Sequence, residues 1–160
     1  MAEPRWLNPT EMDAWRAFID SVGDLTAALE TGLAEHKLTV GDYQVLVYLS
    51  ETPDRQMRMC DLATRLRLSP SGLTRRLDGL VTSGLVTRLP NSSDRRVMMA
   101  ELTSAGWKRL QEAAPDHVAS VRAHLFDYLS ETQVKQMAGI FGAIQKGLST
   151  NQHRDTTVRY

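Results

Sequence analysis

The chain has 160 residues, of which 42% are apolar and 24% charged, so it fits one globular domain and cannot be wholly disordered. Nineteen Lys and Arg balance nineteen Asp and Glu, so the overall charge indicates neither a nucleic-acid nor a membrane partner. A single cysteine, Cys60, excludes an internal disulfide and fits a reducing cytoplasm, where we expect the protein to act. The longest apolar run is residues 45–49, and the start lacks a basic stretch followed by apolar residues. We therefore expect no signal peptide and no membrane span.

The zero net charge conceals a basic central segment. Residues 55–96 hold nine arginines, no lysine and three acidic residues, a formal charge of +6, while the remainder carries −6. Arginine presents a planar fork that grips phosphate and guanine edges, so this segment is a first indication of DNA binding. A solvated positive face is the alternative interpretation.

A long helix is predicted from Pro9, because Asn8 can cap it and Glu11 can bond back to the cap. Apolar residues then recur at spacings of 3, 4, 3 and 4 in the order Trp15, Phe18, Val22, Leu25 and Leu29. So narrow a stripe is typical of helix-on-helix packing. Its partner is either the chain's own later helices or a second subunit.

A shorter helix and a small strand are predicted next. Thr39 and Asp42 have the spacing of a helix start, and this helix should run to about Ser50. Residues 57–59 then alternate briefly, like a short edge strand.

Two helices then follow in close succession. Ser69 and Pro70 end the turn between them and begin the second helix, which Gly84 should close. Two short helices joined by a tight turn, with the small Ala63 where they would cross, are typical of a helix-turn-helix.

The second of these helices presents short polar groups near its start and then two arginines. The outward residues are Ser71, Gly72, Thr74, Arg75, Arg76 and Asp78. This arrangement suits a helix that reads a DNA groove, because its first turns meet base edges and its amide end meets phosphate. A helix that only faces solvent would more usually carry Glu and Lys pairs.

A β-hairpin is predicted after the helix-turn-helix, with strands at residues 85–89 and 97–102 and a polar tip between them. Tip residues of the Asn, Ser and Asp types bond to their own backbone, so the tip can project while Asp94, Arg95 and Arg96 stay oriented. Such a hairpin is a wing, and arginine at its tip suits the narrow minor groove. The alternative is a salt-bridged turn without DNA contact.

Two further helices complete the chain. Thr103 should cap the first, which contains Pro115, where we expect a bend or break. Ser130 and Gln133 should start the last helix, which we expect to end near Gly147.

The predicted fold class is mainly α with a small β-hairpin (α+β), a winged helix-turn-helix domain with N- and C-terminal dimerisation helices. The predicted division assigns residues 1–36 and 103–148 to dimerisation helices, residues 37–102 to the DNA-binding domain and residues 149–160 to a flexible tail.

Several short motifs resemble, in order and spacing, those of the MarR family of winged-helix transcriptional regulators over about residues 9–147. They are Leu62-Ala63, the run Ser-Pro-Ser-Gly-Leu-Thr-Arg at 69–75, Gly-Leu-Val-Thr-Arg at 84–88, Asp94-Arg95-Arg96 and Leu-Thr-Ser-Ala-Gly at 102–106. The resemblance implies a homodimer that binds a pseudo-palindromic double-stranded DNA operator. It also implies repression that small aromatic acids or oxidants relieve.

The resemblance carries over to individual residues. Ser71, Thr74 and Arg75 match the recognition helix, and Asp94 and Arg96 match the wing's Asp-x-Arg. Gly72 and Gly79 depart from the larger residues of the family pattern, and each weakens the helix by up to about 1 kcal/mol relative to Ala. These departures put base preference in doubt, not DNA binding.

Three sets of site residues are predicted, with no catalytic residue, metal or cofactor. DNA contacts are expected at Ser69, Ser71, Gly72, Thr74, Arg75, Arg76, Asp94, Arg95 and Arg96. A small aromatic carboxylate effector is expected to meet Trp15, Tyr43, Tyr48 and Trp107, with Arg88 for the anion, although a core would fill such aromatic positions anyway. Dimer contacts are expected at Trp15, Phe18, Val22, Leu25, Val134, Met137 and Phe141.

Other chemistries have weaker signals. Cys60 lies near a helix start with Arg58 nearby, so a thiol-based redox sensor is an alternative, but we interpret it as a buried structural cysteine. His117 and His124 share a helix face but lie about 10 Å apart along its axis, too far to chelate one ion without ligands such as His36.

No nucleophile elbow, phosphate-binding loop or zinc-protease motif occurs in the sequence, so we do not expect an enzyme. A winged helix that uses the same face for protein contact is the remaining alternative. Salt-dependent duplex binding separates it from a DNA-binding protein.

Overall fold

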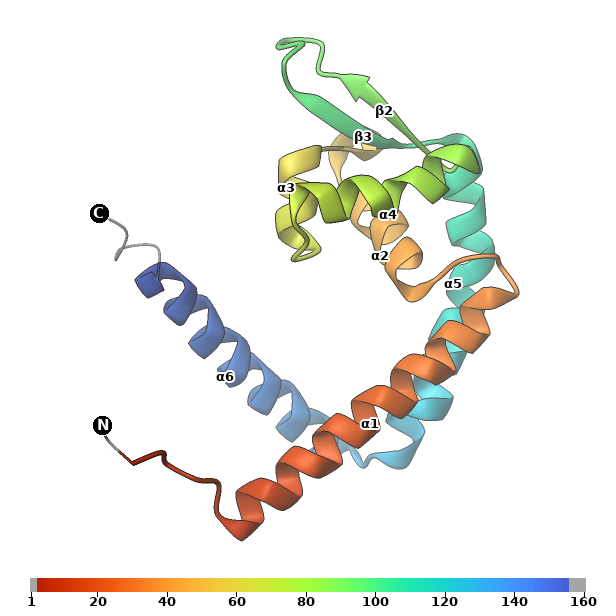
Figure 1. The fold of residues 1–160 in the computed structure, drawn as a ribbon. Helices are drawn as coiled ribbons and strands as arrows, with labels where there is room; N and C mark the ends of the chain where they lie inside the picture. The colour runs from red at the N-terminus through yellow and green to blue at the C-terminus, as the bar shows by residue number, and fades with distance from the viewer. Residues whose placement is uncertain (1–2, 156–160) are drawn as a thin grey trace. The chain divides into compact units, whose positions relative to one another are not determined.

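The structure is a computed structural model that describes residues 3–155. These residues form two units, one up to Ser120 and one from Val121. In chain order the helices and strands are α1 (Pro9–Ala34), α2 (Val40–Ser50), the 3-10 turn η1 (Pro53–Arg55), β1 (Gln56–Arg58), α3 (Met59–Arg65), α4 (Pro70–Thr82), β2 (Val86–Pro90), β3 (Met98–Leu102), α5 (Ser104–His124), the 3-10 turn η2 (Phe126–Tyr128) and α6 (Glu131–Asp155) (Figure 1). The mainly helical class with a small antiparallel sheet is as predicted.

The predicted helix starts are confirmed by their capping hydrogen bonds. At α1 the Asn8 side chain accepts from the Glu11 amide at 2.9 Å, and the Glu11 carboxylate accepts from the Asn8 amide at 2.9 Å. Thr39 and Asp42 form the same reciprocal pair at α2. These caps satisfy amides that have no partner inside their helices, which is why a few residues decide where each helix begins.

Three antiparallel strands form a sheet in the order β1-β3-β2. β2 and β3 are the predicted hairpin, in register from Val86 opposite Leu102 to Pro90 opposite Met98. β1 is the predicted edge strand and adds to the other side of β3. The central strand places Ala100 in the core with no exposed surface.

Leucine side chains dominate the core of the first unit. The buried apolar residues are Leu33, Leu38, Val45, Leu46, Leu49, Leu62, Ala63, Leu73, Leu77, Leu80, Leu85, Val86, Ala100, Leu102, Leu110 and Ala113. Every helix of this unit and the hairpin contribute to one hydrophobic cluster, so α3 and α4 pack against the same core.

Two glycines allow the chain to turn from α4 into the wing and then into α5. Gly84 has a φ of +72° and ends α4, with the Leu85 amide donating to the Leu80 carbonyl at 2.9 Å. At Gly106 an added Cβ would overlap the Leu85 carbonyl oxygen and lie 2.6 Å from Leu102 Cδ1. The first turn of α5 can therefore approach the start of β2 only because residue 106 has no side chain.

The predicted break at Pro115 does not occur. α5 continues through it as one helix from Ser104 to His124. Pro115 is exposed, whereas Leu110 and Ala113, in the turns before it, are buried in the core. Packing of the preceding turns holds the helix where the proline removes one backbone hydrogen bond.

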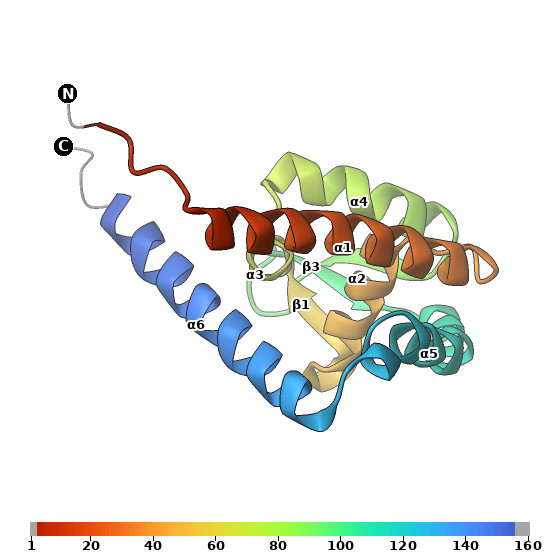
Figure 2. The same ribbon diagram turned by 90° about the horizontal axis from the view of Figure 1, so that it is seen from below.

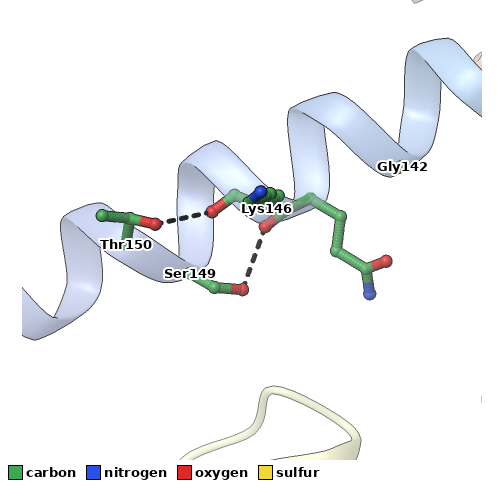
Figure 3. A pocket seen from close by; sticks show the side chains of 5 residues that line it. Gly142, Lys146, Ser149 and Thr150 are labelled. Atoms are coloured by element: carbon green, nitrogen blue, oxygen red, sulfur yellow. Dashed lines mark hydrogen bonds between the residues drawn. The ribbon is translucent and has the colours of Figure 1, made fainter.

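The last helix is longer than predicted. α6 does not end near Gly147 but continues to Asp155 as one helix (Figure 2). Beyond Gly147 the Ser149 and Thr150 hydroxyls bond back to the carbonyls of Gln145 and Lys146 at 2.9 and 3.0 Å (Figure 3). Among the described glycines only Gly84 has a positive φ, so Gly147 keeps helical geometry and does not cap.

Residues 149–155 of the predicted flexible tail are therefore helical, and residues 156–160 lie outside the described residues. Within the described part of the chain, no helix is both long enough and apolar enough to cross a bilayer.

Candidate nucleic-acid interface

The helix-turn-helix is formed by α3 and α4. Ala63 is buried on α3, and Leu73 and Leu77 are buried on α4, so the apolar side of each helix faces the core. Ser69 caps α4 by accepting from the Gly72 amide at 3.1 Å. The opposite side of α4 is left exposed at Ser71, Thr74, Arg75 and Asp78.

The exposed polar residues of α4 differ in whether their side chains already make hydrogen bonds within the chain. Thr74 donates from Oγ1 to the Pro70 carbonyl at 3.0 Å, and Ser71 Oγ lies 3.2 Å from Ser69 Oγ. Arg75 is exposed, and its side chain makes no hydrogen bond or ion pair with the described residues. Its guanidinium is therefore available to a ligand outside the chain.

The wing tip between β2 and β3 is organised by two side chains. Asn91 Oδ1 accepts from the amides of Ser93 and Asp94 at 2.9 and 3.2 Å. Asp94 Oδ1 accepts from the Arg96 amide at 3.0 Å and pairs with Arg96 Nε at 3.4 Å. The Arg96 side chain is nevertheless 95% exposed. Figure 1 shows the hairpin tip standing clear of α3 and α4, so its arginines face solvent.

Arg76, predicted with Arg75 to contact DNA, lies differently. Its Nη1 donates to Thr39 Oγ1 at 3.2 Å and lies 3.7 Å from Asp42 Oδ1, so its guanidinium rests on the start of α2. Residues one position apart on a helix point about 100° apart, which explains why neighbours in sequence have such different surroundings.

Arg88, predicted to bind an effector, ties β2 to α4. Its Nη2 donates to the Thr74 carbonyl and to Asp78 Oδ1, both at 2.8 Å. Its Nε is buried and has no hydrogen-bond partner among the described residues. Asp78 thus holds the arginine that the sequence assigned to a ligand's carboxylate.

The aromatic residues predicted to line an effector pocket each make a contact with a different neighbour. Tyr48 lies under the Arg65 guanidinium at 4.3 Å, and Trp107 lies under that of Arg55 at 4.4 Å. Trp15 is 53% exposed on α1. Each aromatic residue is used in a separate local packing contact.

The fourth of these residues, Tyr43, packs against His117, with ring centroids 4.2 Å apart. Burial raises the pKa of Tyr43 and lowers the pKa of His117, which favours the uncharged form of both rings. His36 pairs instead with Asp116 at 2.8 Å, and no three potential ligands lie together among the described residues as a metal site requires.

Cys60 is exposed, so the interpretation as a buried structural cysteine is wrong. Leu62 and Ala63, two and three positions further along the chain, supply the core-facing side of α3, which leaves Cys60 on the solvent side. Its Sγ lies 3.5 Å from Asp61 Oδ1.

Two long helices carry apolar side chains that this single chain leaves exposed. On α1 they are Trp15, Phe18, Ile19 and Val22, and on α6 they are Ile140, Phe141, Ile144 and Leu148. Of the other predicted dimer residues, Leu25, Val134 and Met137 are half-buried. Stripes of this kind on a monomer usually mark an interaction surface.

Comparison with known proteins agrees with this geometry. A sequence model of the MarR family matches residues 36–97. The chain is similar to AbsC, a MarR family transcriptional regulator from Streptomyces coelicolor, with 38% identity, a TM-score of 0.87, and coverage of 92% of this chain and 99% of that one. It is similar to Sco3205, a MarR family regulator from the same organism solved in complex with DNA, with 34% identity, a TM-score of 0.87 and coverage of 92% and 93%. The transcriptional repressor YetL of Bacillus subtilis (strain 168) is 26% identical over 133 residues, 81% of this chain and 80% of its own length.

The fold and the exposed face of α4 define a winged helix-turn-helix DNA-binding protein. The chain belongs to the MarR family and is a transcriptional regulator, as its sequence motifs predicted.

Proposed function

We propose that the protein is a homodimeric repressor that acts in the cytoplasm and binds a pseudo-palindromic operator. The α4 helix enters the major groove, where Arg75 meets a base edge, and Arg95 and Arg96 of the wing enter the adjoining minor groove. The observation that carries this proposal is the unpartnered guanidinium of Arg75 on the exposed face of α4. DNA binding is supported by the similar Sco3205, which was solved in complex with DNA, and repression by the similar YetL, a transcriptional repressor.

A dimer follows from the geometry of DNA. Two recognition helices reach successive major grooves only if they are held about one helical turn, roughly 34 Å, apart. The exposed apolar faces of α1 and α6 supply surface for such an association, and they include the predicted Trp15, Phe18, Val22 and Phe141.

The test begins with selection of duplexes from a random pool by the purified protein. The selected duplex should contain two inverted half-sites, and its affinity should fall steeply with salt because bound phosphates release counterions. Scrambled duplexes of the same composition serve as controls. Absence of any salt-dependent duplex binding would leave the winged helix as a protein-contact module.

For regulation we propose release by a small aromatic carboxylate that replaces Asp78 at Arg88. Arg88 Nε has no partner and lies beside the bonded Nη2, so a carboxylate that displaces Asp78 and exposes the buried Nε would bond to both nitrogens. Loss of the Asp78 contact would loosen β2 from α4, and with it the wing from the recognition helix.

Ligand release implies reciprocal coupling, since an effector that weakens operator binding must itself bind more weakly when operator is present. Salicylate titrated with and without the selected duplex should show this difference in affinity. Equal affinities, or no binding at millimolar concentration, would exclude this route and leave oxidation of the exposed Cys60 as the alternative to examine.

A further inference from the structure

We infer that Arg76 is a positioning residue that sets the orientation of the recognition helix and does not itself contact DNA. The inference rests on the proposed DNA-binding function and divides the adjacent arginines of α4 into two roles. Arg75 is free for DNA, whereas Arg76 connects α4 to α2.

The contact with α2 is specific. Arg76 Nη1 meets Thr39 Oγ1 at 3.2 Å and Asp42 Oδ1 at 3.7 Å, and these two residues are the reciprocal pair that caps α2. The Asp42 side chain is 22% exposed, so it lies more deeply than a typical surface carboxylate. The guanidinium therefore rests on a rigid element, the first turn of a capped helix.

Gly41 makes this contact possible. A Cβ at residue 41 would lie 2.6 Å from Arg76 Cζ and 2.7 and 2.8 Å from its two terminal nitrogens. The guanidinium thus lies directly against the backbone of α2, where no other residue type leaves room for it. A hollow of about 380 Å³ adjoins this contact, so a displaced guanidinium can move without shifting the backbone. The hollow is lined by Asp42, Leu68, Gly72, Arg75, Arg76 and Gly79.

A second arginine holds α4 from β2. Arg88 bonds the Thr74 carbonyl and Asp78, as Arg76 bonds the start of α2. The helix is thus tied to two different elements besides its buried leucines. Because base readout needs side chains placed to within a fraction of an ångström, both ties preorganise the reading face.

The first experiment measures affinity for the selected duplex against salt concentration. Arg76→Ala should weaken operator binding about tenfold and leave the slope of log affinity against log salt at the wild-type value. Arg95→Ala, on the wing, is the control, and its slope should fall by about 0.9 because one positive charge that neutralises the DNA is lost. A comparable fall for Arg76→Ala would overturn the inference and make Arg76 a phosphate contact.

A double-mutant cycle and a second variant test whether Arg76 acts through its contact with α2. Asp42→Asn keeps a capping acceptor but removes the charge partner, so its effect should not add to that of Arg76→Ala. Gly41→Ala should displace the guanidinium and so weaken operator binding even though Arg76 is intact. Arg76→Lys should bind the operator more tightly than Arg76→Ala. Additive effects in the cycle, or wild-type affinity for Gly41→Ala, would overturn the inference.

Thermal unfolding and sedimentation of each variant without DNA check that fold and assembly are retained. If Arg76→Ala fails to fold, Gly41→Ala and Asp42→Asn still decide the question. Failure of the wild-type protein to bind any duplex would count against the proposed function. If the wild-type protein binds the operator and the variants bind it equally tightly, only this inference is contradicted.

Discussion

Single residues of the basic segment have different partners, although all its bases are arginines. Arg55 and Arg65 stack on aromatic rings, while Arg76 and Arg88 bond to neighbouring elements. Arg75 is left unpartnered within the described chain. Local positive charge therefore overstates the number of arginines that are free to meet DNA.

Arg75→Ala should weaken binding to the selected duplex by about 1–3 kcal/mol, or roughly 5- to 150-fold, because a forked donor to a base edge is lost. Random duplexes should lose much less affinity, and the melting temperature without DNA should not change. Fluorescence anisotropy with both duplexes measures the effect. Equal losses on both would show that Arg75 contacts phosphate.

Gly106→Ala should lower the free energy of unfolding by about 3 kcal/mol, because the new Cβ would overlap the Leu85 carbonyl oxygen. Gly79→Ala is the matched control. Its Cβ would meet no atom within 4 Å, so it should stabilise the protein by up to about 1 kcal/mol through better helix propensity. Urea unfolding of both variants measures these changes. Wild-type stability of Gly106→Ala would contradict the close approach of α5 to β2.

At the scale of elements, the capped helix starts were predictable because each cap involves residues three apart in the chain. The Asn8–Glu11 and Thr39–Asp42 pairs form as expected. Helix ends were less predictable, since a bend or break was expected at Pro115 and an end near Gly147, and neither residue ends its helix. Packing of the buried turns before Pro115, and continued backbone hydrogen bonding after Gly147, outweigh the local preference.

The wing is an element whose DNA contact should be mainly electrostatic. Replacing Arg95 and Arg96 together by Ala should weaken binding to selected and random duplexes alike and lower the salt slope by about 2. The corresponding double Lys variant keeps both charges and should retain the slope. An unchanged slope in the Ala variant would remove the wing from the DNA interface.

At the scale of the whole molecule, the exposed apolar side chains of α1 and α6 are the surface on which the proposed dimer depends. Val22 is 44% exposed in the middle of the α1 stripe. A charge in a buried interface costs several kcal/mol unless it is paired.

Val22→Glu should therefore dissociate the dimer and abolish tight operator binding, because the two half-sites are no longer bound together. Sedimentation velocity measures the mass. Ala27→Glu places the same charge on the other side of α1 and should leave the dimer intact. The same mass for wild type and Val22→Glu would show that this stripe is not the interface.

The caps, the leucine periodicity, the turn at Ser69 and Pro70, and the polar wing tip could all be predicted from the sequence, because each depends on residues only a few positions apart. Tertiary structure alone decided which arginines are free. Arg76 meets Thr39 across 37 positions, and Arg88 meets Asp78 across the turn from α4 into β2. It also decided that Cys60 is exposed and that Tyr48 and Trp107 each lie under an arginine. A side chain's direction is set by how whole elements pack, and no local pattern in the sequence records that packing.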